Sequence, residues 1–221
     1  MEAYGMQRYQ VLGGPEWAAG TVRFDVMAKA AVVPSRQQML QMVQHLLNER
    51  FSLRAHRETR ELPVYVLNLA RDDGRPGKQL TRTMVDCAVI RADRARKEGG
   101  DAGYLLIPPK GERPACGEIQ TARPGGPNGL TLTYRAEGRT MTELSSWLSQ
   151  YVGRTVLDRT GLMGEFDVEV SFHPGGERAG APVEAVSIFT AIQEQLGLKL
   201  DSSKGPVDVM IIDSAEMPTP D

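Results

Sequence analysis

The sequence predicts an α+β fold with two related lobes, each a small, mostly antiparallel sheet with one or two helices packed on one face. An internal repeat supports this prediction, because Val22–Ala28 (VRFDVMA) returns as Gly164–Val170 (GEFDVEV). An amphipathic helical pattern and two short apolar segments follow each copy. Self-similarity of this kind indicates a duplicated unit. We therefore expect lobes at residues 1–70 and 130–221, with a connector at residues 71–129.

The first lobe combines alternating segments with one helix. Ser35 is a good N-cap, and the apolar residues after it recur at helical spacing until about Arg50. Alternation of apolar and polar residues predicts strands over Arg8–Leu12, Thr21–Ala31, Phe51–His56 and Leu62–Ala70. The polar link Glu58–Glu61 has the length of a hairpin turn.

The second lobe is expected to have the order β-α-β-β-α-β-β. One helix begins at Thr140 or Thr142 and ends at Gly153, which suits a left-handed C-terminal position. A second helix covers Val186–Leu196. The strands are predicted over Leu130–Ala136, Thr155–Leu157, Glu165–Phe172, Leu198–Asp201 and Val207–Ile212.

The connector is rich in Gly, Pro, Arg and Asp, and a loop of this length is unusual inside a compact domain. Its polar sequence surrounds Cys87 and Cys116, whereas buried free cysteines usually lie among apolar residues. A disulfide between them would stabilise the segment by on the order of 3 kcal/mol and would imply an oxidising compartment. Two free surface thiols are the alternative.

Composition excludes some classes of partner. The formal net charge is −2, so bulk charge does not favour nucleic acid. No apolar run reaches the roughly 20 residues that cross a bilayer, and the N-terminal MEAYGMQRYQ lacks the basic and apolar regions of a signal peptide. We expect no nucleic-acid partner, no transmembrane segment and no signal peptide in this chain.

His56 and Glu58 form one candidate catalytic pair. Strand alternation places both side chains on one face, and a histidine beside a carboxylate suits general-base chemistry. The alternative is a ladder of surface charges that stabilises a hairpin. The chain has no Gly-x-Ser-x-Gly elbow and no His-Glu-x-x-His motif.

Asp158, Arg159 and Thr160 form a candidate binding motif, although Asp158 and Thr160 are also good turn formers. Trp17 and Trp147 are candidate ligand platforms, or else anchors of the core. Carboxylates such as Asp208 and Asp213 are too scattered for a calcium-binding loop. We expect no cofactor and no metal site, and binding of a divalent ion such as calcium is left open.

Several longer strings resemble a family of uncharacterised proteins abundant in soil bacteria. They are Gly13–Trp17, Leu46–Phe51, His56–Tyr65, Val156–Asp167 and Ala191–Leu200. The pair of cysteines in the connector also resembles the family pattern. The resemblance implies a domain of unknown function that is usually exported and is sometimes fused to a membrane metallopeptidase of the β-lactam-receptor type. It implies an extracytoplasmic location, periplasmic or secreted, and no particular reaction.

These observations predict a non-enzymatic interaction or sensory module of the cell envelope that binds a protein or an envelope ligand. An open sheet edge in the first lobe would also allow a homodimer. The alternative is a hydrolase of small esters or lactones, which would use His56 with Glu58 or a bound divalent ion.

Overall fold

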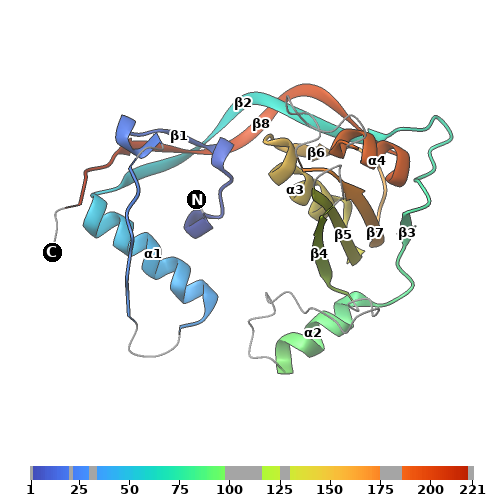
Figure 1. The fold of residues 1–221 in the computed structure, drawn as a ribbon, viewed down its shortest axis with the longest axis horizontal. Coiled ribbons are helices and arrows are strands. Elements are labelled where there is room, and N and C mark those ends of the chain that lie inside the picture. Colours follow the sequence, from blue (N-terminus) through green and yellow to red (C-terminus); the bar gives the residue numbers. More distant parts are fainter. Residues whose placement is uncertain are drawn as a thin grey trace. The chain divides into compact units, whose positions relative to one another are not determined.

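The computed structural model describes residues 2–19, 22–29, 34–97, 116–124, 130–174 and 186–218. These residues form helices and two four-stranded sheets, which confirms the α+β class (Figure 1). The chain divides into two compact units, with residues 1–62 and 204–221 in unit 1 and residues 63–203 in unit 2. This division differs from the expected lobes, because the last strand contributes to both units.

The strands β2 (Arg54–Leu69) and β8 (Leu198–Ser214) are each longer than expected. The sequence predicted two short strands in each region, with a polar turn at Glu58–Glu61 in the first and a break between Asp201 and Val207 in the second, and both interruptions are wrong. Most side chains in these stretches are exposed, so polar residues fit the strand at little cost. Hydrogen bonds between side chains of β2 and β8 also support the continuous strands. For example, the Thr59 hydroxyl lies 2.7 Å from the Asp208 carboxylate.

In unit 1, the short strand β1 (Val11–Gly13) pairs in parallel with β8. Three 3₁₀-helices, η1 (Glu2–Tyr4), η2 (Arg8–Gln10) and η3 (Glu16–Ala19), surround β1 in the sequence. Helix α1 (Arg36–Phe51) begins after the predicted N-cap, where the Ser35 hydroxyl accepts a hydrogen bond from the Gln38 backbone N–H.

The two copies of the sequence repeat differ in structure. Residues 22–29, the described part of the predicted strand Thr21–Ala31, form neither helix nor strand. The second copy forms β7 (Phe166–Phe172), which has a paired strand on each side. The second copy has neighbouring strands that pair with its backbone, whereas residues 22–29 form no strand, and the duplication of lobes remains a prediction.

Unit 2 contains an antiparallel sheet with the order β3-β7-β5-β4. Its strands besides β7 are β3 (Leu80–Arg82), β5 (Leu130–Arg139) and β4 (Glu118–Pro124). Both edge strands come from the expected connector, which is thus part of the sheet where it is described. The strand β6 (Val156–Asp158) pairs in parallel with β2 in the other sheet.

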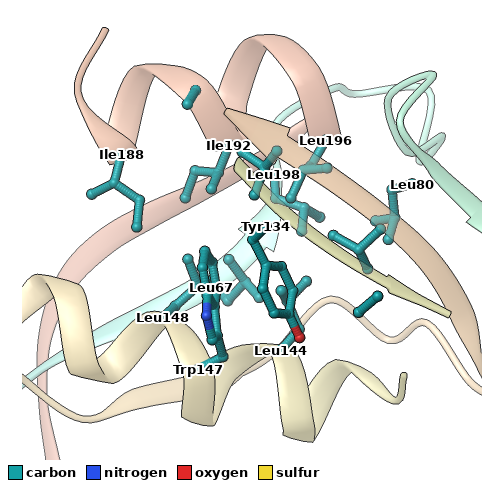
Figure 2. Packing of buried hydrophobic residues seen from close by; sticks show 14 of the residues in the cluster. Leu67, Leu80, Tyr134, Leu144, Trp147, Leu148, Ile188, Ile192, Leu196 and Leu198 are labelled. Carbon is teal, nitrogen blue, oxygen red and sulfur yellow. The ribbon is translucent and has the colours of Figure 1, made fainter. Parts of the chain in front are cut away.

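The core of unit 2 lies between this antiparallel sheet, helices α3 (Met141–Val152) and α4 (Ile188–Leu196), and the ends of β2, β6 and β8. Figure 2 shows side chains of both helices pointing into this interior. The Trp147 ring stacks on Tyr134 with 4.0 Å between centroids. The predicted residues Thr140 and Gly153 cap α3, with a capping box at Thr140 and a left-handed conformation at Gly153, and Gly197 is likewise left-handed at the end of α4.

A disulfide joins Cys87 to Cys116 and anchors the connector to the sheet. Cys87 begins α2 (Cys87–Lys97), and Cys116 lies just before β4; both side chains are buried. Gly138 makes room for the bond, because a Cβ there would lie 2.3 Å from the Cys87 sulfur. On the same helix, the Arg91 guanidinium lies 3.1 Å from Glu165 and donates to the Gly138 carbonyl.

Replacing both cysteines with serine should lower the free energy of unfolding of unit 2 by about 3 kcal/mol, because the bond closes a long loop in the unfolded chain. Urea denaturation, followed by fluorescence in a Trp17→Phe background, reports unit 2 through Trp147 alone. A reductant should destabilise the disulfide-bonded protein similarly and leave the double variant unchanged. Equal stability of the two proteins would contradict the anchoring role of the bond.

Candidate functional site

The antiparallel sheet of unit 2 has a polar face opposite its core. Along β7, Phe166, Val168, Val170 and Phe172 are buried, because alternate side chains of a strand point to the same side. The intervening residues are Asp167, Glu169 and Ser171, and their neighbours on β5 include Thr133 and Arg135. We call this surface the polar face.

Cross-strand bonds fix several side chains of the polar face. Arg135 lies directly opposite Glu169 in the sheet, and its guanidinium donates to that carboxylate at 2.8 Å. The hydroxyls of Thr133 and Ser171 are also opposite each other and lie 2.8 Å apart. The bond to Glu169 raises the pKa of Arg135 above its ordinary value, because the carboxylate stabilises the charged guanidinium.

A shallow cavity of about 130 Å³ lies on the polar face. Its lining includes ionic groups of both signs and comes from the segment around β3 together with β5 and β7: Lys78, Gln79, Thr81, Arg135, Ala136, Glu137, Asp167, Val168 and Glu169. The Asp167 carboxylate accepts a hydrogen bond from the Gly138 backbone N–H at 3.1 Å. Among the described residues, Lys78 and Glu137 have no ion-pair partner, so both can contact a ligand.

The polar face was missed by the sequence analysis, although its two central strands were predicted. The alternation of polar residues in Thr131–Glu137 and Glu165–Ser171 was the available signal. It could not show that Arg135 meets Glu169, because that contact depends on the register between strands 34 residues apart.

The predicted pair of His56 and Glu58 lies on β2. The His56 Nε2 atom is 3.8 Å from the Glu58 carboxylate, while Nδ1 is 2.9 Å from Asp213 on β8. A carboxylate at Nδ1 is the arrangement that orients a general-base histidine. Here, however, the second nitrogen faces another carboxylate, so the cluster is suited to holding the ring as a cation. The sequence had placed Asp213 only among scattered carboxylates.

Asp158 and Thr160 bond to each other in a turn. The Asp158 carboxylate accepts from the backbone N–H and the hydroxyl of Thr160, at 2.9 and 2.8 Å. The Thr160 hydroxyl in turn accepts from the Leu162 backbone N–H. These contacts support the structural alternative for Asp158 and Thr160, while Arg159 is exposed. Ligand binding by these three residues remains a prediction.

The two tryptophans lie in different units. Trp147 is buried in the core of unit 2, as the alternative for this residue anticipated. Trp17 is partly exposed in unit 1, where its ring lies 6.1 Å from Phe24 and 6.3 Å from Phe51, measured between centroids. A role for either ring in ligand binding is untested.

Within the described ranges, no three His, Cys, Asp or Glu side chains are grouped closely enough to hold a metal ion. The same residues include no helix with both the length and the apolar character needed to cross a bilayer.

Comparison with known proteins assigns the chain to a family. The family described as protein of unknown function (DUF3738) matches residues 1–215. The chain belongs to the DUF3738 family. No curated protein and no solved structure matches it. The assignment agrees with the expected resemblance to an uncharacterised family and names no reaction or ligand.

The pKa of His56 should depend on Asp213. The hydrogen bond to Asp213 raises this pKa above the ordinary value of 6.5, and Glu58 adds to the effect. In Asp213→Asn the pKa should fall toward 6.5, as measured by NMR titration of the ring protons. Because the folded-state pKa is raised, the pair stabilises the folded chain at acidic pH, and this contribution is lost as the pH rises through that pKa.

The matched control is Asp201→Asn, which removes a β8 carboxylate whose hydrogen bond is to Asn68 rather than to a histidine. It should leave the His56 titration unchanged. A His56 pKa that is the same in Asp213→Asn and in the unmodified chain would contradict the assigned pair.

Proposed function

We propose that this protein is an extracytoplasmic, non-enzymatic interaction or sensory module of the cell envelope, and that its ligand meets the polar face of unit 2. The cavity on that face carries the proposal, because it combines two ionic groups of opposite sign, Lys78 and Glu137, which have no ion-pair partner within the described part of the chain. The fixed pair of Arg135 and Glu169 lies beside them, so part of the surface is ordered before binding.

The size of the cavity favours a macromolecular ligand. Sites for small molecules usually enclose about 300–1,000 Å³, so a cavity of about 130 Å³ holds only one group of a larger partner. Its charges favour a ligand that offers both an anion to Lys78 and a cation to Glu137. A polypeptide segment with acidic and basic side chains has this chemistry, and we propose a protein of the envelope as the partner.

The buried disulfide supports an extracytoplasmic location. Disulfides persist in oxidising compartments and are rare in the cytosol, where thiols are kept reduced. The exposed fractions of Cys87 and Cys116 are 0% and 3%, so this bond is built into the fold rather than presented for exchange. The family resemblance adds that such proteins are usually exported.

The second candidate is a hydrolase of small esters or lactones centred on His56. The contact between His56 and Asp213 favours it, because an oriented imidazole can act as a general base. Activity toward ester and lactone panels that is lost in His56→Ala and retained in Lys199→Ala would establish this candidate. It would also overturn the non-enzymatic part of the proposal.

A photo-crosslinking amino acid at Thr81 tests the polar face directly. Thr81 lines the cavity and is exposed, so the probe should capture an envelope protein in cells that export the chain. The matched control places the same probe at Gln150. This exposed residue lies on α3, the helix that packs against the buried face of the antiparallel sheet. We expect a discrete crosslinked product at position 81 and none at position 150.

The same product should weaken when Lys78→Glu and Glu137→Lys are combined, because both free charges are then reversed. Equal crosslinking at positions 81 and 150, or none at either position, would contradict the proposed binding face.

A further inference from the structure

Strand β4 forms one edge of the antiparallel sheet of unit 2, and within the described part of the chain no strand pairs with its outer side. It pairs with β5 at every position from Glu118 to Pro124, and the register has no shift along the way. Folded proteins usually protect an edge strand by making it short, by a bulge or by a covering segment. A regular edge of this length can therefore accept another strand.

The direction of the backbone groups on β4 follows from one hydrogen bond. The Glu137 N–H donates to the Gly117 carbonyl at 3.0 Å, so these opposed residues bond across the ladder. Along an antiparallel edge strand, such residues alternate with residues whose N–H and C=O groups point outward. The outward groups on β4 belong to its even-numbered residues Glu118, Gln120 and Ala122. Pro124 agrees with this assignment, because an edge strand accepts a proline where the missing N–H would point outward.

The other side of the sheet is closed, which distinguishes it from β4. There the edge strand β3 has three residues, and the Leu80 N–H turns back to the Gly77 carbonyl at 3.2 Å. Beyond β3, the Gln195 side-chain amide donates to the Ser171 carbonyl of β7 and accepts from the Ser171 N–H, at 2.8 and 2.9 Å. Both contacts use groups that an added strand would need, so the sheet is extended more readily at β4.

We infer that an extended segment of the partner protein pairs with the outer edge of β4 as an additional strand of the sheet. An extended polypeptide presents the alternating N–H and C=O groups that match this edge, and such main-chain bonds are a recurring mode of peptide recognition. The outward groups are bonded through the backbone, so this edge selects a conformation of the partner, while the cavity selects its charges.

This inference rests on the proposed function, because the edge and the cavity of the polar face are close together. Arg135 and Glu137 line the cavity from β5, and Arg135 lies directly opposite Ile119 of β4. Neighbouring strands are about 4.8 Å apart, so a strand added outside β4 lies roughly 10 Å from β5. One partner protein can therefore occupy the edge and the cavity together, which favours it over a second copy of this chain.

The disulfide prepares the edge for binding. Cys116 is buried directly before β4 and is bonded to Cys87, so the start of the strand is held in place. An edge that is ordered before binding loses little conformational entropy when a partner strand pairs with it, and association is favoured accordingly.

Amide hydrogen exchange of the isolated full chain, followed by NMR, tests whether the edge is open. The Gln120 N–H should exchange rapidly, whereas the Thr121 N–H, which faces β5, should be protected. Protection of the Gln120 N–H at every protein concentration would mean that another segment of the chain covers the edge. Protection that grows with concentration would mean that a second copy does. Either result would overturn the inference.

Gln120→Pro tests the added strand in cells that export the chain. It removes one outward N–H and places a ring at the edge, so the crosslinked product of the probe at Thr81 should fall by about tenfold. The matched control is Gln120→Ala, which removes the same side chain but keeps the N–H and should leave the product unchanged. The Thr121 N–H should stay protected in Gln120→Pro, because the fold does not use the Gln120 N–H.

The outcomes separate this inference from the proposed function. A product that is equally strong in Gln120→Pro and in the unmodified chain would overturn the added strand and leave the proposed binding face intact. An equal loss in Gln120→Ala, or loss of Thr121 protection in Gln120→Pro, would overturn the assigned role of the β4 backbone. A lack of product in the unmodified chain would contradict the binding face and this inference together.

Discussion

The alternation of side chains along β7 is the constraint on which unit 2 depends. Its even-numbered residues fill the core beneath α3 and α4, and its odd-numbered residues form the polar face. A shift of the strand by one residue would exchange these two sets and place Glu169 in the core. The seven buried or paired positions of this strand therefore determine both the stability of unit 2 and the location of its candidate binding surface.

The two units bury their apolar residues to different extents. Unit 2 has a continuous core with stacked and edge-to-face rings around Trp147, and a disulfide holds its edge strand β4 in place. Unit 1 buries few side chains, and its only α-helix in the described residues exposes an apolar stripe. The first pattern is typical of a rigid scaffold, whereas unit 1 leaves several large apolar side chains of its helix exposed.

Local signals in the sequence predicted α1, α3 and α4, whereas α2 (Cys87–Lys97) lies in the segment that was expected to be a connector. Ser35, Thr140 and Gly153 each cap the expected helix, because capping depends only on residues within one turn. The long strands were not predicted, since polar residues such as those at 58–61 fit a solvent-exposed strand as readily as a turn. The contacts of His56 with Asp213 and of Arg135 with Glu169 join distant segments, so they depend on register that no local pattern specifies.

The most direct test of the assigned facing of β7 is the reactivity of single cysteines along it. The chain has two cysteines and both are in the disulfide, so an introduced cysteine is the one free thiol. Under native conditions, Glu169→Cys and Ser171→Cys should react readily with a maleimide. Val168→Cys and Val170→Cys should react only after denaturant is added. Equally fast native labelling at all four positions would contradict a sheet with one buried and one open face.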